Sequence, residues 1–193
     1  MEPESNLRHS VAAHILLGEA YDGLSESSNA IAEFKAARAI SSNEPRILFG
    51  LGYLYWKARA YDEAKRAFEG ELSVDSGNAM ALTYLGDIAL KNNQADAALA
   101  LLRRATTINQ DIRLAYMDLG FIYLREEKYK DAQAAFGHAV TLDPSQTDAH
   151  YQLGRLYQRL DNTAAADREF ALVQKLYQNS EDKVAKNMAL RIH

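Results

Sequence analysis

Apolar and small side chains recur along this chain with a period of 34 residues. The dipeptide Leu-Gly occurs five times in strict register, at residues 17–18, 51–52, 85–86, 119–120 and 153–154. An alanine follows each glycine after twelve residues, and a large apolar residue follows it after sixteen. These large residues are Phe34, Phe68, Leu102, Phe136 and Phe170. A fixed period of this length predicts one structural unit repeated in tandem.

Each unit predicts two antiparallel helices. In the first helix of each unit, four positions share one face because they stand at i, i+3, i+4 and i+7. They are the fourth residue of the unit, the leucine, the glycine and the residue three places after the glycine. A glycine inside a helix costs about 1 kcal/mol relative to alanine. Five glycines in register therefore need a packing reason, and we expect the two helices of each unit to approach closely there.

Prolines and polar residues mark the junctions between units. Pro45 falls at the start of a predicted first helix, where proline is tolerated. Pro144 ends the fourth unit, and Ser145 with Asp148 resembles a capping box for the next helix.

This pattern resembles the tetratricopeptide repeat, whose signature has large, leucine, small, aromatic, alanine, aromatic, alanine and proline residues at these offsets. The fourth unit matches it most fully, with Tyr116, Leu119, Gly120, Tyr123, Ala132, Phe136, Ala139 and Pro144. Ala89 in place of an aromatic residue and Glu71 in place of alanine depart from it and indicate local looseness. The resemblance implies an all-α, right-handed superhelical solenoid with repeats at 11–44, 45–78, 79–112, 113–146 and 147–180.

The two ends fall outside the repeats. Residues 1–10 are expected to form a flexible leader. Residues 181–193 carry an apolar stripe and predict a helix that caps the last repeat. The stripe consists of Val184, Ala185, Met188 and Ile192.

Composition narrows the function. The formal charge is −4, from 22 basic and 26 acidic side chains, so we expect no general attraction to nucleic acid or anionic membranes. The chain has no cysteine, which excludes disulfides and thiolate metal sites. The amino terminus lacks the pattern of a secretory signal, and the longest apolar run, residues 11–17, is too short for direct membrane insertion. The cellular compartment stays open.

No pattern of catalytic residues emerges. His14 and His150 occupy position 4 of their repeats, where a histidine that packs between helices is the better interpretation than a ligand. Metalloprotease, carboxylate-triad and phosphate-binding glycine motifs are absent from the sequence. We therefore expect a protein that is not an enzyme, with no catalytic residue, metal or cofactor.

The resemblance also implies a concave groove lined by positions 2, 5, 9, 12 and 13 of the first helices. The candidate partner-binding residues at such positions are Arg46, Phe49, Tyr53, Trp56, Met80, Thr83, Leu114, Met117, Phe121, Leu124, Tyr151 and Arg155. The centre of this set is aromatic and aliphatic, and exposed apolar patches usually mark contact surfaces. In an alternative interpretation, positions 5 and 12 pack partly against the neighbouring unit.

Charge at these positions suggests the partner's chemistry. In units two to five, six basic residues stand against two acidic ones, Asp87 and Asp148. The leading hypothesis is a protein-interaction module that binds a peptide or amphipathic helix with apolar and acidic character. The alternatives are a scaffold or regulatory arm of a larger, possibly enzymatic, polypeptide and a self-associating scaffold. We expect a monomer or at most a weak homodimer.

Overall fold

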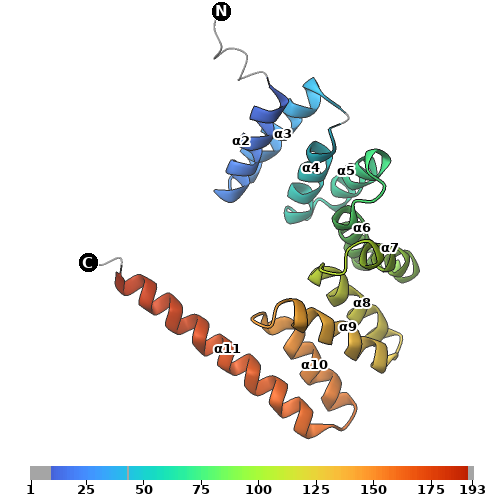
Figure 1. Cartoon of the computed structure of the whole chain (residues 1–193), viewed down its shortest axis with the longest axis vertical. Helices are drawn as coiled ribbons and strands as arrows, with labels where there is room; N and C mark the ends of the chain where they lie inside the picture. Colours follow the sequence, from blue (N-terminus) through green and yellow to red (C-terminus); the bar gives the residue numbers. More distant parts are fainter. Residues whose placement is uncertain (1–9, 43, 191–193) are drawn as a thin grey trace, which may run out of the picture. The chain divides into compact units, whose positions relative to one another are not determined.

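The computed structural model describes residues 10–42 and 44–190, and for Pro45 and residues 183–190 it describes the backbone only. Within this part of the chain, the regular elements are all α-helices (Figure 1). The ten helices are α2 (Val11–Gly23), α3 (Ser27–Ile40), α4 (Pro45–Lys57), α5 (Tyr61–Val74), α6 (Ala79–Lys91), α7 (Ala95–Ile108), α8 (Arg113–Arg125), α9 (Tyr129–Leu142), α10 (Thr147–Arg159) and α11 (Thr163–Leu190).

The predicted repeat is confirmed by where these helices begin. The first helices of the five units start at residues 11, 45, 79, 113 and 147, and the second helices start at 27, 61, 95, 129 and 163. The two helices of each unit lie side by side, as α2 and α3 show in Figure 1. The chain is thus an all-α solenoid of helix pairs.

The glycines allow the close helix contact that the sequence predicts. A Cβ atom on Gly52 would lie 2.7 Å from the ring of Phe68, and one on Gly120 would lie 2.4 Å from the ring of Phe136. Real Cβ contacts are longer than this, so any larger residue would push the two helices apart. The alanine twelve residues after each of the five glycines is fully buried.

The turn between the two helices of each unit contains one residue with a left-handed backbone. These residues, with φ between 55° and 62°, are Ser25, Arg59, Asn93, Glu127 and Asp161. Their spacing is again 34 residues. None is a glycine, although glycine adopts this conformation most easily.

The helices group into two compact units. Unit 1 ends at Asn109 and contains α2 to α7, and unit 2 begins at Gln110 and contains α8 to α11. The apolar core of unit 1 includes Phe34 and Leu51, and that of unit 2 includes Phe136 and Leu153.

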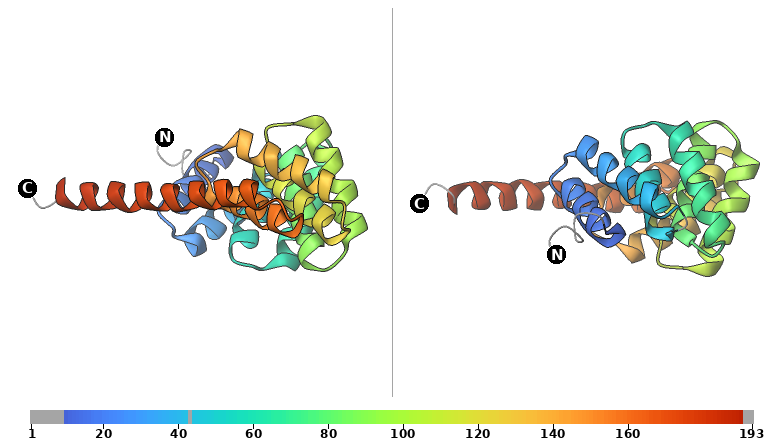
Figure 2. Two further views of the ribbon diagram at one scale, coloured as in Figure 1. Left: turned by 90° about the horizontal axis from the view of Figure 1, so that it is seen from below. Right: turned by 90° about the horizontal axis from the view of Figure 1, so that it is seen from above.

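The carboxyl-terminal region differs from the prediction of a separate capping helix at 181–193. Helix α11 runs without a break from Thr163 to Leu190, so residues 181–190 continue the second helix of the fifth repeat. In Figure 2 this helix, drawn in red, extends well past the shorter α10. The predicted apolar stripe lies outside the residues whose side chains are described. The leader at 1–10 also lies outside them, except for Ser10, whose hydroxyl accepts a hydrogen bond from the Ala13 amide and caps α2.

Candidate functional site

The candidate groove residues lie on the first helices of their repeats, α4 and α6 in unit 1 and α8 and α10 in unit 2. Four of them are exposed, namely Arg46, Phe121, Tyr151 and Arg155. Six are partly buried, namely Phe49, Tyr53, Trp56, Met80, Leu114 and Leu124. The other two, Thr83 and Met117, are buried.

Thr83 and Met117 belong to the core, which corrects their assignment to an open groove. The Thr83 side chain is fully buried and its hydroxyl donates to the Ala79 carbonyl one turn earlier, at 2.8 Å. Met117 packs in the core of unit 2 with Leu153, a residue of the following repeat. Contact between repeats thus uses a position that the pattern assigned to the groove.

An aromatic cluster in unit 1 joins helices α4, α5 and α6. The ring of Tyr84 is its centre, with centroid distances of 4.9 Å to Trp56, 5.2 Å to Phe68 and 5.8 Å to Tyr53. Phe49 lies within 6.1 Å of Tyr84 as well. Burial raises the pKa of Tyr84 to about 12, so its phenol is neutral at physiological pH. Sequence reasoning missed Tyr84 because its position in the repeat is not a groove position in the family.

Asp87 fixes the orientation of Trp56. The indole Nε1 of Trp56 donates to one carboxylate oxygen of Asp87 at 2.5 Å, and Nζ of Lys91 donates to the other at 2.5 Å. Asp87 is 2% exposed, so these charge-assisted bonds compensate its burial. Asp87, which the sequence placed at a groove position, therefore stabilises the aromatic cluster by fixing the Trp56 side chain.

A pocket of about 390 Å³ opens beside this cluster in unit 1. Its apolar wall consists of Phe34, Phe49, Gly50, Tyr53 and Leu54. Its polar wall consists of Glu19, Asp22, Arg46, Glu71, Asp75 and Asn78. The volume lies in the range of pockets that take a small ligand or a few side chains. Three predicted groove residues, Arg46, Phe49 and Tyr53, thus line one site.

Ion pairs cancel the positive charge that the sequence suggested for this region. Nη2 of Arg46 lies 2.6 Å from Glu19, and Nζ of Lys57 lies 2.6 Å from Asp22. The hydrogen bond to Asp22 raises the pKa of Lys57. Both acids are on α2, which the charge comparison of units two to five left out. Because these basic side chains are already paired, the pocket gives no reason to expect acidic residues in the partner.

Glu71 is an unusual member of the polar wall because it is 1% exposed. Its Oε1 accepts a hydrogen bond from Nδ2 of Asn78 at 2.8 Å, while Oε2 is buried without a hydrogen-bond partner. Burial raises the pKa of this carboxyl group, and the nearby charge of Asp75 acts in the same direction. Sequence analysis had interpreted Glu71 only as a departure from the repeat pattern.

In unit 2 two exposed aromatic residues, Phe121 and Tyr151, each pack against a ring of the second helix of the same repeat. Phe121 meets Phe136 edge-on at 5.4 Å, and Tyr151 meets Phe170 at 6.0 Å. Phe121 and Tyr151 remain 37% and 43% exposed, so each presents a ring face or edge to a partner. Arg155 is exposed on the same helix as Tyr151.

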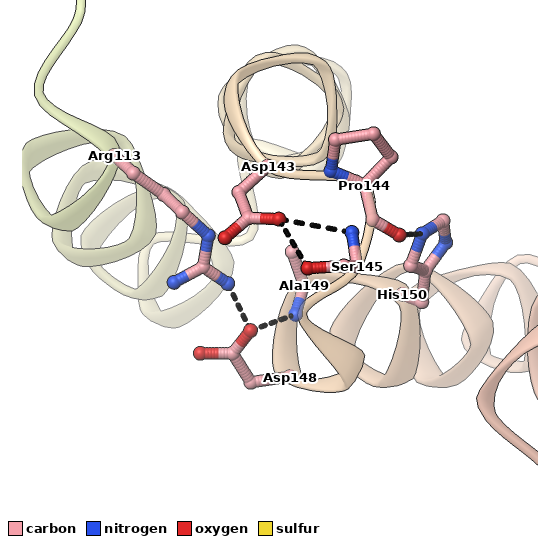
Figure 3. Close-up of polar contacts among 7 residues, drawn as sticks. All are labelled: Arg113, Asp143, Pro144, Ser145, Asp148, Ala149 and His150. Carbon is pink, nitrogen blue, oxygen red and sulfur yellow. Dashed lines mark hydrogen bonds and ion pairs between the residues drawn. The ribbon is translucent and has the colours of Figure 1, made fainter. Parts of the chain in front are cut away.

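The predicted capping box at the start of α10 is wrong. Figure 3 shows that the Ser145 amide and hydroxyl donate to Asp143, at 3.0 and 2.6 Å. Asp148 instead accepts from the Ala149 amide and forms an ion pair with Arg113. The Ser145 hydroxyl lowers the pKa of Asp143. Asp148, the second acidic groove position, is thus paired with a base.

Comparison with known families identifies the repeat. Two family profiles, both described as tetratricopeptide repeat, match residues 49–111 and 123–189, together more than half of the chain. The chain belongs to the tetratricopeptide-repeat family. No curated protein sequence matches it significantly.

Solved structures of tetratricopeptide-repeat proteins share this fold. MamA 41-end from Desulfovibrio magneticus RS-1 is 24% identical with a TM-score of 0.73, over 88% of this chain and 96% of its own. YrrB, described as a TPR protein with an unusual peptide-binding site, is 24% identical with a TM-score of 0.66, over 88% and 87%. PilF of Pseudomonas aeruginosa is 19% identical with a TM-score of 0.77, over 88% and 78%. At these identities the likeness concerns the fold.

The tetratricopeptide repeats make this chain a protein–protein interaction module. Scaffold proteins of this type are generally not catalytic. Among the described residues, no three histidine, aspartate or glutamate side chains gather as metal ligands would. No helix in the described part of the chain has both the length and the apolar character needed to cross a bilayer.

Proposed function

We propose that this tetratricopeptide-repeat protein is not an enzyme and holds an extended or helical segment of a partner protein in the pocket of unit 1. The observation that carries the proposal is the 390 Å³ pocket with an aromatic wall of Phe34, Phe49 and Tyr53. Aromatic residues in a concave site provide large apolar contact areas at low entropic cost, and they dominate the energetics of many interfaces.

The surroundings of the pocket suit recognition of a side chain. The rings of Tyr84 and Phe68 pack against the ring of Phe49. The hydrogen bond from the Trp56 indole to Asp87 holds Trp56 against Tyr84. A wall fixed in this way loses little entropy when a partner binds. YrrB offers a precedent for peptide binding on this fold. The exposed rings Phe121 and Tyr151 give unit 2 a further contact surface for the partner.

Selection from a random-sequence peptide library tests this proposal. We expect the selected peptides to lose at least tenfold affinity for Phe49→Ala and for Tyr53→Glu, with folding checked by circular dichroism. Leu24→Ala is the matched control, because Leu24 is an exposed apolar residue of unit 1 that does not line the pocket. Peptides that bind all three variants as tightly as the parent protein would contradict the proposal.

Self-association is a second candidate function, favoured by exposed leucines on α2 and at its carboxyl-terminal end. Leu16, Leu17 and Leu24 are 62%, 46% and 69% exposed. Exposed apolar side chains can bind a second copy of the chain, although association costs offset much of the gain. Light scattering over a wide concentration range tests it: a mass that rises above the monomer, and that Leu16→Gln lowers again, would support this function. A constant monomer mass would exclude it.

A further inference from the structure

The acidic side chains of the unit 1 pocket are not equivalent. Glu19 and Asp22 each have a basic partner, Arg46 and Lys57 respectively, at 2.6 Å. Glu71 and Asp75 line the same pocket, and neither forms an ion pair with any described residue. The pocket therefore contains two carboxyl groups whose charges are not balanced.

Glu71 stands where three other repeats of this chain have alanine. The equivalent positions of the first, third and fourth repeats are Ala37, Ala105 and Ala139, all fully buried. Helix α5 packs against both α4 and α6, as α3 packs against α2 and α4 and α9 packs against α8 and α10. Burying a carboxyl group with one oxygen unpaired costs free energy that alanine would not. Because alanine is tolerated at this position in other repeats, the presence of a costly buried acid indicates that the Glu71 carboxyl group binds a ligand.

The surroundings hold the Glu71 carboxyl group in one orientation. Asn78 donates from Nδ2 to Oε1 of Glu71, while its own Oδ1 accepts from the Ala81 amide and caps α6. Oε2 is buried and has no hydrogen-bond partner among the described residues, and Glu71 is one of the residues that line the pocket. The nearby carboxylate of Asp75 makes the same end of the pocket more negative, as its effect on the pKa of Glu71 indicates.

We propose that the pocket receives a lysine or arginine side chain of the partner segment, whose cationic group pairs with the carboxyl groups of Glu71 and Asp75. The methylene groups of that side chain contact the apolar wall at Phe49 and Tyr53. Aromatic rings also favour a cation placed over their faces. This inference rests on the proposed function and specifies the partner's chemistry: a basic residue in an apolar context, and not the acidic partner that the sequence suggested.

Nuclear magnetic resonance titration with small probes tests the charge requirement. We expect Nα-acetyl-lysine N-methylamide to shift the amide signals of Phe49, Gly50, Glu71 and Asn78. The neutral analogue Nα-acetyl-norleucine N-methylamide, which has a similar shape, should bind at least tenfold more weakly. Equal binding of the two probes would overturn the proposal.

Two substitutions provide matched controls. Glu71→Ala installs the residue found at this position in three other repeats, so the protein should fold, and Glu71→Gln keeps the shape while removing the charge. We expect both to weaken lysine binding at least tenfold and to leave norleucine binding unchanged. Full lysine affinity in a folded Glu71→Ala protein would overturn the proposal.

The selected peptides separate this inference from the proposed function. If they bind in the pocket without lysine or arginine and tolerate Glu71→Ala, the inference fails while the proposed function stands. If lysine or arginine is enriched and Glu71→Ala abolishes binding, both are supported. If spermidine binds through Glu71 and no basic peptide does, the pocket takes a free amine, which overturns the assignment to a partner protein.

Discussion

The imidazole Nδ1 of His150 lies 2.7 Å from Oε2 of Glu169, and the same pair recurs at 2.6 Å between His14 and Glu33. Each pair joins position 4 of a first helix to the residue nineteen places later in the second helix. The three middle repeats have two apolar or aromatic residues there, namely Leu48 with Ala67, Leu82 with Leu101, and Tyr116 with Ala135. A polar pair therefore replaces an apolar one only in the first and last repeats.

His150→Leu should destabilise the protein by about 1 kcal/mol, because Glu169, whose side chain is only 19% exposed, would lose its partner. The double variant His150→Leu/Glu169→Ala copies the second repeat and should recover most of that loss. A coupling free energy of about 0.5 kcal/mol or more is expected for residues in contact. Urea unfolding followed by circular dichroism measures the cycle, and strictly additive losses would show that the two residues do not interact.

Asp87→Leu should cost about 2 kcal/mol, because the Trp56 indole N–H would be buried beside an apolar side chain without an acceptor. Trp56 is the only tryptophan, so its fluorescence should report a changed environment. Lys91→Ala is the companion variant: it keeps the acceptor for Trp56 but leaves the buried carboxylate of Asp87 without its basic partner, so it should cost about 1–3 kcal/mol and leave the tryptophan emission unchanged. An Asp87→Leu protein with unchanged stability and emission would contradict the assigned role.

Two glycines of the fourth repeat should respond in opposite directions to alanine. A Cβ on Gly120 would clash with Phe136 at 2.4 Å, so Gly120→Ala should lower stability by about 1–3 kcal/mol. A Cβ on Gly137, inside α9, meets no atom within 4 Å, so Gly137→Ala should raise stability by about 0.5–1 kcal/mol. Thermal unfolding of the two variants gives the comparison, and the prediction fails if both change the melting temperature in the same direction.

Arg59→Gly should stabilise the protein slightly, by about 0.5 kcal/mol. Arg59 has a φ of 58°, which costs a non-glycine residue about 1–2 kcal/mol, and the greater chain entropy of glycine offsets part of the gain. Asn93 occupies the equivalent turn at 59° and tolerates this conformation well, so Asn93→Gly should bring little or no gain. Melting temperatures measured side by side test the difference, and a larger gain for Asn93→Gly would refute it.

The raised pKa of Glu71 predicts a pH dependence of stability. The folded protein holds this proton more tightly than the unfolded chain, so the contribution of Glu71 to stability falls as pH rises above the ordinary value of 4.5, until the raised pKa is passed. Asp75, Arg46, Glu19 and Asp22 line the same pocket and are present in parent and variant alike.

Glu71→Gln should therefore gain stability relative to the parent protein as pH increases from 4.5 to 7, whereas the two should differ least below pH 4. Urea unfolding at a series of pH values measures this difference. A difference that stays constant with pH would mean that burial does not disfavour the ionised form of Glu71.

The groove assignments show where sequence reasoning was limited. Position within the repeat placed Arg46, Phe49 and Tyr53 on one pocket. The same rule placed Met117 on an open surface, although it packs against Leu153 of the next repeat. The rule describes the direction in which a side chain leaves its helix, whereas exposure depends on how closely the neighbouring helix approaches.

The sequence by itself determined the repeat, the helix positions and the close helix contacts, because a strict 34-residue period leaves one way to bury the same face of every unit. Only the tertiary structure decided the chemistry of the pocket. Arg46 pairs with Glu19 and Lys57 pairs with Asp22, over 27 and 35 positions in the sequence. These pairs neutralise the positive charge that the numbers of basic and acidic groove residues suggested. Glu71 likewise lies in the pocket wall without an ion-pair partner because packing between α4, α5 and α6 buries it. No local sequence pattern encodes that burial.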